Sequence, residues 1–191
     1  MEKVISFGVQ LSIRCTPQVD IDDDYHLLTY KGLAALSWIT RHCGHVPWIL
    51  HADDDVFIDI FLLHINMREF DVKTVEHFFC NALTSHVLRS GRWAVSHKQY
   101  PSHQYPVFCS GRLWILPTRL APKIVKAAKN EPFLWVDDVF ITGILGRKAN
   151  ISVIGDPDGF ASESINASDI GRVLAWHSVK DRQRWWDILQ R

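Results

Sequence analysis

Three consecutive aspartates, Asp53–Asp55, separate two apolar segments of the chain and constrain how it can fold. The run "PWIL" before them suits a short buried strand. The run "DIFLLHINMREF" after them suits a helix that is capped by Asp59. Because adjacent carboxylates repel one another, something must make this cluster tolerable at the point where the strand ends.

The residues alone leave three explanations of the aspartate cluster open. A solvated turn with a helix cap is the usual explanation of a charged run. A Ca²⁺ loop needs ligands spread along a loop with Gly at its bend, and that spacing is absent here. A Mg²⁺ or Mn²⁺ site needs only one or two carboxylates together with the phosphates of a ligand, and its cation would relieve the repulsion.

The rest of the chain alternates irregularly between helix and strand patterns. Residues 24–43 predict a helix, with N-cap candidates at Asp22–Asp24 and a C-cap at Gly44. Its apolar face contains Leu28, Ala35, Leu36, Ile39 and Cys43. Further strands are predicted at 4–9, 77–83, 92–96, 110–117 and 151–155. Further helices are predicted at 119–130, capped by Thr118, and at 137–149 and 180–191.

This order of elements predicts an α/β fold, a sandwich built on a mixed, mostly parallel sheet. Apolar residues continue from end to end without a linker, so we expect a single domain over residues 1–191. Ligands of such sheets bind beyond the carboxyl ends of the strands, which is where Asp53–Asp55 stand.

Composition limits the partners of the chain. The formal net charge is zero, so no overall field attracts nucleic acid or an anionic membrane. No apolar run approaches the roughly 20 residues of a membrane span, and the first residues do not read as a signal peptide. Four cysteines without a CxxC pair argue against a zinc site and leave three disulfide pairings open. Sequons at Asn150 and Asn166 are weak hints of a secretory route.

Five ordered blocks of the sequence resemble the β1,3-galactosyltransferase-like family, glycosyltransferase family 31. "WILHADDDVF" is similar to the apolar strand and D-D-D-V-F element of that family. "DIDDDYHLLTYKGLAALSWITRHC" is similar to its D-F-x-D-x-Y-x-N-L-T-x-K segment, with Leu27 for Asn. "RSGRWAVSHKQYPSHQYPVFCSG" is similar to its K-W-x-V-S…Y-P…Y-P-x-Y-C-S-G segment, with Arg92 for Lys and Phe108 for Tyr. "VDDVFITGIL" is similar to its E-D-V-Y-V-T-G motif, with Asp137 for Glu, and His177 matches a late histidine.

The resemblance implies a GT-A-like fold and a metal-dependent, inverting hexosyltransferase. Galactose or N-acetylglucosamine would move from its UDP donor to the 3-hydroxyl of an acceptor glycan on protein or lipid. Asp55 and His177 would ligate Mn²⁺ or Mg²⁺ at the UDP diphosphate, and Asp53 and Asp54 would hold the donor ribose, sugar or metal-bound water. Asp138 would be the catalytic base, because a sugar hydroxyl needs a positioned carboxylate to accept its proton.

Four further residues are candidates for substrate contact, each with an ordinary structural alternative. Trp93 and Trp135 can stack on sugar faces, although most aromatic side chains form core. Gly111 permits close backbone approach to a ligand, or simply begins a strand. Asp137 stands beside the base and raises the pKa of one acid of the pair, or serves only in a helix N-cap.

The sequence also departs from the family pattern. Family members carry an N-terminal membrane anchor, a stem and an opening strand-helix unit with an R-x-T-W element, which is absent here. We therefore expect a domain that is partial at its N-terminus, and a Golgi location by resemblance only. A catalytically inactive remnant that binds glycan or serves as a partner subunit is the alternative. A phosphoesterase would need further metal ligands, which we do not find.

Overall fold

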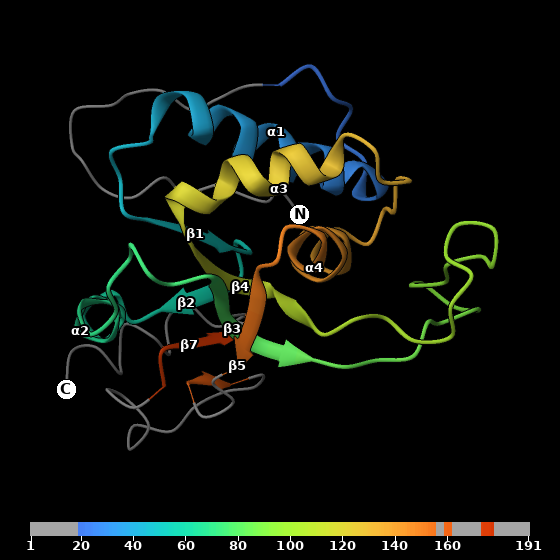
Figure 1. Ribbon diagram of the computed structural model, residues 1–191. Helices are drawn as coiled ribbons and strands as arrows, with labels where there is room; N and C mark the ends of the chain where they lie inside the picture. The colour runs from blue at the N-terminus through green and yellow to red at the C-terminus, as the bar shows by residue number, and fades with distance from the viewer. Residues whose placement is uncertain (1–18, 156–158, 162–172, 178–191) are drawn as a thin grey trace.

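The computed structural model describes residues 19–155, 159–161 and 173–177. The strand expected at 4–9, the helix expected at 180–191, Cys15 and Asn166 lie outside these residues. Within them the predicted α/β class is confirmed, because a mixed sheet is flanked by helices (Figure 1). No helix in the described part of the chain is long and apolar enough to cross a membrane.

The first sheet has the strand order β1-β4-β3-β5. Its strands are β1 (Trp48–Ala52), β4 (Phe108–Pro117), β3 (His77–Leu83) and β5 (Ser152–Gly155). β4 pairs antiparallel with β1 and β3, and β3 pairs parallel with β5. Three of the four strands therefore run in one direction, but β4 lies between two of them in reverse. This strand makes the sheet mixed, and it brings its first residues to the carboxyl ends of β1 and β3.

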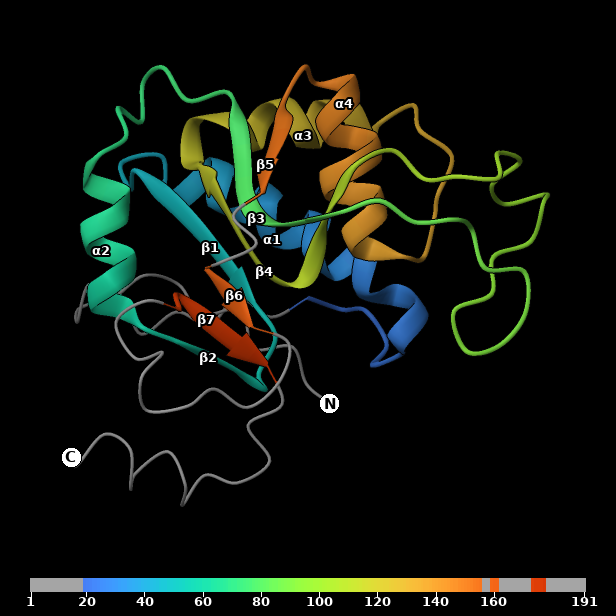
Figure 2. The ribbon, with the colours of Figure 1, turned by 90° about the horizontal axis from the view of Figure 1, so that it is seen from below.

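A second, smaller sheet has the order β2-β7-β6, with β2 (Val56–Ile58), β7 (Ala175–His177) and β6 (Phe160–Ala161). β2 pairs antiparallel with β7, and β6 pairs parallel with β7. Figure 2 shows this sheet next to the end of β1. The aspartate cluster is consequently the turn through which the chain leaves the first sheet and enters the second.

Helices cover one face of the first sheet, where α1 (Leu28–His42) and α3 (Ala121–Ala128) lie side by side (Figures 1 and 2). The short helices η1 (Tyr25–Leu27) and η2 (Thr118–Leu120) precede them. The core between helices and sheet is apolar, and its fully buried side chains include Leu36, Phe78, Leu116, Ile124 and Leu145. Every residue predicted for the apolar face of α1 is buried except Cys43, which is half-buried.

Helix ends agree with some local signals and differ from others. Asp24, one of the predicted N-cap candidates, caps η1 by accepting from the backbone N–H of His26. Asp59 caps α2 (Ile60–Arg68), as predicted, by accepting from two backbone N–H groups of its first turn. Gly44 does not end α1 in a left-handed turn, because Cys43 closes the helix with a bond to the Ile39 carbonyl. Thr118 does not cap a helix either; it is the buried first residue of η2, after Pro117.

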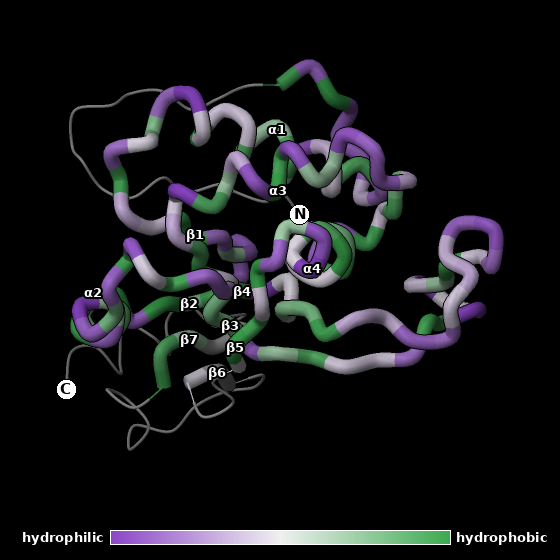
Figure 3. The backbone as a smooth tube through the Cα atoms, in the orientation of Figure 1, coloured by the Kyte–Doolittle hydropathy of each residue, from purple (hydrophilic) through white to green (hydrophobic). Residues whose placement is uncertain are grey.

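The helix predicted at 137–149 exists, but its middle is a π-helix, η3 (Val139–Leu145), followed by α4 (Gly146–Lys148). All seven residues of η3 are buried. Figure 3 shows this apolar helix against the sheet. Wider π turns are rare and often stand at functional sites.

The strand predicted at 92–96 is wrong. Residues 84–107 form an extended excursion between β3 and β4, which we call the arm, and it projects from the body of the protein (Figure 1). Gly91 has φ of 84°, and its carbonyl accepts from Ala94 N–H, so the chain turns here instead of extending. The carbonyl of Val95 accepts from the side chain of Arg89, not from a neighbouring strand.

The structure selects one disulfide from the pairings that the sequence left open. Cys80 on β3 and Cys109 on β4 are joined, with Cα atoms 5.5 Å apart, and both are fully buried. The register of β3 against β4 shifts between Cys80 and Ala82, so the disulfide lies where the ladder is irregular. Cys43 is free.

Candidate active site

Asp53–Asp55 occupy the turn between β1 and β2, as predicted from the end of the apolar run. The backbone N–H of Asp53 donates to the Arg112 carbonyl over 3.0 Å, which extends the pairing of β1 with β4 by one residue. The Asp53 carbonyl accepts from Val56 N–H over 3.3 Å and closes the turn. Asp54 is exposed, whereas Asp53 and Asp55 are half-buried.

Asp138 is held at the start of η3 by its own segment and by β4. Its Oδ1 accepts from the backbone N–H of Val139 over 2.7 Å, which is the helix-cap arrangement expected for this acid pair. Its carbonyl accepts from the Thr142 hydroxyl over 2.6 Å, and the same hydroxyl accepts from Cys109 N–H over 2.9 Å. Because Thr142 is fully buried, this chain of bonds fixes the helix start against β4.

Gly111 explains how the Asp138 carboxylate reaches the sheet. A Cβ atom at residue 111 would lie 3.3 Å from Oδ2 of Asp138, closer than ordinary contact. The absence of a side chain at Gly111 therefore lets the carboxylate lie directly against β4. The close approach predicted at Gly111 occurs here to another candidate residue, Asp138.

β4 brings the backbone of Asp53 and the carboxylate of Asp138 to neighbouring residues. The Arg112 carbonyl accepts from the backbone N–H of Asp53, and Gly111, one residue earlier, lies against the Asp138 carboxylate. The turn of the aspartate cluster and Asp138 thus both adjoin one short stretch of β4, at the carboxyl end of β1. A site with separate roles for the aspartate cluster and for Asp138 needs the two segments near each other in this way. The roles themselves remain predictions.

His177 approaches the aspartate cluster through its backbone. In the pairing of β2 with β7, His177 is the register partner of Val56, the residue that follows Asp55. The structure describes only the backbone of His177, so its predicted role as a metal ligand remains a prediction.

Among the described residues, no three His, Cys, Asp or Glu side chains are placed so that together they could hold a metal ion. A Mg²⁺ or Mn²⁺ ion that is held largely by substrate phosphates needs only one or two protein carboxylates. Half-buried carboxylates at a strand end are hard oxygen donors, so the residues present fit such an ion.

Trp93 and Trp135, predicted as substrate contacts, come together from separate segments. Their rings are nearly parallel, at 14°, with centroids 6.3 Å apart. Tyr25 from η1 joins them, with ring centroids 5.3 Å from Trp93 and 6.2 Å from Trp135. The guanidinium of Arg92 lies 4.8 Å from the Trp93 ring centroid. The sequence analysis gives Arg92 only as a replacement of the family's Lys and assigns no role to Tyr25, so this cluster was not predicted.

Tyr105 connects the arm to Asp138. Burial raises the pKa of its phenol, the Asp138 carboxylate raises it further, and the guanidinium of Arg89 opposes both. The ring is buried and lies 5.1 Å from that of Tyr100, centroid to centroid. In the sequence, the two tyrosines of the "QYPSHQYP" segment were the signal for this pair of rings.

The chain has an α/β fold with acids beyond the carboxyl ends of its strands, which is where α/β proteins hold their ligands. The sequence pattern of the Galactosyltransferase family matches residues 17–157, and the chain belongs to this family. It is 26% identical to Beta-1,3-galactosyltransferase 2 of Homo sapiens over 178 residues, covering 88% of this chain and 42% of that protein. It is also 26% identical to Beta-1,3-galactosyltransferase 5 of Homo sapiens over 184 residues, covering 91% of this chain and 58% of that protein. The chain thus spans about half the length of the curated relatives it matches.

Proposed function

We propose that the chain is the sugar-transferring domain of a UDP-sugar-dependent hexosyltransferase that forms β1,3 linkages. The donor would be UDP-galactose or UDP-N-acetylglucosamine, and the acceptor the 3-hydroxyl of a glycan on protein or lipid. Membership of the family supports the reaction class. The observation that carries the proposal is that the aspartate turn and the Asp138 carboxylate adjoin the same stretch of β4, at residues 112 and 111, because transfer needs a donor site near a base. This arrangement also favours an enzyme over a noncatalytic remnant.

Asp138 acts as the base in this proposal. Its carboxylate accepts the proton of the acceptor hydroxyl while the hydroxyl oxygen attacks the anomeric carbon of the donor sugar. The bond from that carbon to the UDP oxygen breaks in the same displacement, so the configuration inverts without a covalent enzyme intermediate. The cap bond to Val139 and the contact with Gly111 hold the carboxylate in place. Asp137 contacts substrate beside it.

Asp55 and His177 would hold Mn²⁺ or Mg²⁺, and Asp53 and Asp54 would contact the donor. The cation supplies neutralisation of the charge that develops on the departing diphosphate. The half-buried Asp55 carboxylate and the register of His177 beside Val56 support this assignment. The positive charge of the cation would then offset the repulsion between the adjacent acids of the cluster.

A secretory-pathway location, namely the Golgi lumen, belongs to the same proposal. The Cys80–Cys109 disulfide supports it, because structural disulfides form and persist in oxidising compartments. The family resemblance suggests the Golgi in particular.

Titration calorimetry with UDP, with and without Mn²⁺, tests the proposal. We expect Mn²⁺-dependent UDP binding by the wild-type chain and its loss in Asp55→Asn. Asp59→Asn is a matched control, since it removes a nearby charge while Asn still caps α2. Unchanged Mn²⁺-dependent binding in Asp55→Asn contradicts the metal role. A donor screen of the wild-type chain with Mn²⁺ then identifies the sugar.

A further inference from the structure

Three segments that are distant in sequence build an aromatic surface beside the arm, which we call the aromatic platform. It consists of Tyr25 from η1, Arg92 and Trp93 from the arm, and Trp135 from the segment before η3. Trp135 is only 5% exposed and forms the floor. Tyr25 and Trp93 are 43% and 41% exposed, so their rings contact the buried Trp135 ring and still present surface to solvent. Exposed clusters of this kind mark ligand or partner sites.

Arg92 completes the platform with hydrogen-bond donors. Its guanidinium lies 4.8 Å from the ring centroid of Trp93 and 5.7 Å from that of Tyr25, a cation–π arrangement with both. Arg92 is exposed, and no carboxylate among the described residues forms an ion pair with it. Flat apolar rings next to free N–H donors match a sugar ring, which has C–H faces and hydroxyl edges.

The charge around the platform favours a neutral ligand. Asp23 and Asp24 stand on the approach to Tyr25, where Asp23 pairs with Lys31 and Asp24 with His26. Among the described residues of this surface, the Lys31 charge is matched by Asp23, and Asp24 adds a negative charge next to the positive charge of Arg92, so the surface has no large excess of positive charge to attract a sulfate or carboxylate.

The arm holds the platform in a fixed shape before any ligand binds. The Arg89 guanidinium donates to the backbone carbonyls of Val95, Tyr100 and Ser102, at 2.9, 2.9 and 2.6 Å. The N–H of Val95 donates to the Leu88 carbonyl over 2.8 Å, which closes the turn that carries Arg92 and Trp93. A preorganised surface loses little entropy on binding, so even a small ligand gains affinity from it.

The platform begins close to Asp138 along the chain. Trp135 precedes Asp138 by three residues, a span of at most about 11 Å of chain, and the ring centroids of Trp93 and Trp135 are 6.3 Å apart. These spans bring Trp93 within reach of a second sugar when the first sugar presents its hydroxyl to Asp138. We propose that the aromatic platform binds the neutral sugar adjacent to the reacting one and thereby selects oligosaccharide over monosaccharide acceptors. This inference rests on the proposed function for the role of Asp138.

Saccharide binding without donor or metal tests the platform directly. We would titrate the full chain with galactose, lactose and N-acetyllactosamine by calorimetry and follow tryptophan fluorescence. The wild-type chain is expected to bind the disaccharides about 10-fold more tightly than galactose, the scale of one aromatic contact. Trp93→Ala should remove this preference, Trp93→Phe should retain part of it, and Arg92→Ala should weaken it about threefold. Phe61→Ala, on the exposed face of α2, is the control for loss of a surface aromatic ring.

The outcomes separate this inference from the proposed function. Equal disaccharide affinity in Trp93→Ala and wild type overturns the platform, as does a wild-type chain that binds neither disaccharide. If Mn²⁺-dependent UDP binding and transfer occur while Trp93→Ala keeps the wild-type acceptor KM, the platform fails and the proposed function stands. If the chain binds disaccharide through Trp93 but neither binds UDP nor transfers sugar, the platform stands and the proposed function fails. Thermal unfolding of each variant verifies that it is folded.

Discussion

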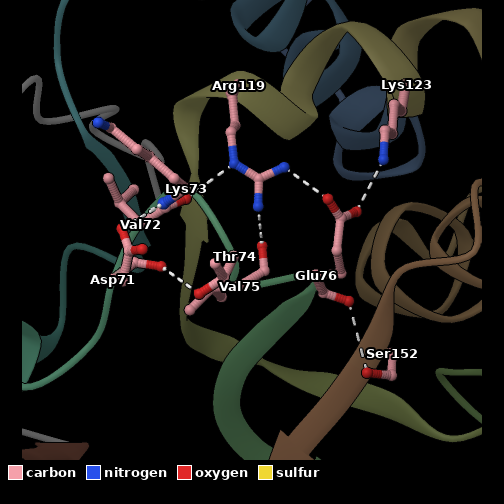
Figure 4. A network of polar contacts seen from close by, with 9 residues as sticks. All are labelled: Asp71, Val72, Lys73, Thr74, Val75, Glu76, Arg119, Lys123 and Ser152. Atoms are coloured by element: carbon pink, nitrogen blue, oxygen red, sulfur yellow. Dashed lines mark hydrogen bonds and ion pairs between the residues drawn. The ribbon is translucent and has the colours of Figure 1, made fainter.

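Polar residues have different roles at the two ends of the strands β1, β3 and β5 of the first sheet, which we call the amino edge and the carboxyl edge. At the amino ends of β3 and β5, Glu76 accepts from Arg119 and Lys123, and Arg119 also donates to the carbonyls of Val72 and Val75 (Figure 4). Glu76 in turn accepts at its carbonyl from the backbone of Ser152. At the carboxyl edge, the Asp138 carboxylate lies against Gly111, and the aspartate turn begins at Asp53, whose backbone pairs with Arg112.

This contrast distinguishes polar residues that hold the fold from polar residues available for chemistry. The Glu76 side chain has two basic partners, so its charge is compensated within the fold. At the other ends of the strands, the Asp138 carboxylate accepts from a backbone N–H group, and the three adjacent acids of Asp53–Asp55 favour a cation or a proton-bearing ligand. We therefore expect substitutions at the carboxyl edge to change activity, and substitutions at the amino edge to change stability.

The largest effect is expected from Asp138→Asn. Transfer should fall roughly 10²–10⁴-fold, because an amide cannot accept the proton of the acceptor hydroxyl. Asn can still cap η3, so UDP binding and the unfolding midpoint should stay close to wild type. Steady-state kinetics together with UDP calorimetry measure both properties. Near-normal turnover would remove Asp138 as the base.

The disulfide is expected to have the next largest effect, because it ties β3 to the first residues of β4. Replacing both Cys80 and Cys109 by Ala should lower the free energy of unfolding by about 2–4 kcal/mol, measured by urea denaturation. Cys43→Ala is the matched control, since that thiol is free and burial raises its pKa. An unchanged urea midpoint in the double variant would show that the link adds no stability.

Arg119→Ala tests the amino edge. We expect a loss of about 1–3 kcal/mol in the free energy of unfolding, because two backbone carbonyls and one carboxylate lose their donor. Lys123→Ala removes only an exposed ion pair and should cost less than about 1 kcal/mol. Activity below the unfolding range should be unchanged in both variants. A fall in turnover would erase the distinction between the two edges.

Gly111→Ala tests whether the contact with residue 111 sets the position of the Asp138 carboxylate. The added methyl group would lie 3.3 Å from Oδ2 of Asp138, so the carboxylate has to move by a few tenths of an ångström. We expect kcat to fall about 10-fold, since catalysis depends on such positioning, with little change in UDP affinity. Wild-type kcat would mean that the contact with Gly111 does not set the position of the carboxylate.

The smallest effect is a pH dependence at the amino edge. Hydrogen bonds from Lys123 and Arg119 hold the pKa of Glu76 below its ordinary value. A lowered pKa in the folded state contributes stability that is present above the unfolded pKa and is lost as pH falls through the folded value. Because the side chain is 44% exposed, we expect less than about 1 kcal/mol. Urea midpoints of wild type and Glu76→Gln between about pH 6 and 3 should converge on acidification; a constant difference contradicts the prediction.

Much of the fold was predictable because its signals are local. The cap at Asp59 and the ends of the strand at 77–83 follow from neighbouring residues, and both are confirmed. The strand at 92–96 was wrong because its β-forming residues are overridden by the turn at Gly91 and by the Arg89 side chain. The π-helix was not predicted, since its helical pattern does not distinguish one turn type from another.

The sequence alone determined the placement of Asp53–Asp55 at the end of a strand and of Asp138 at a helix start, because burial patterns and caps act over a few residues. Only the tertiary structure decided that the aspartate turn and Asp138 adjoin the same stretch of β4, that Cys80 pairs with Cys109, and that Tyr25 joins Trp93 and Trp135. These contacts join residues far apart in the chain. They depend on how β4 inserts in reverse between β1 and β3, a choice made by packing of the whole core and not by any short segment.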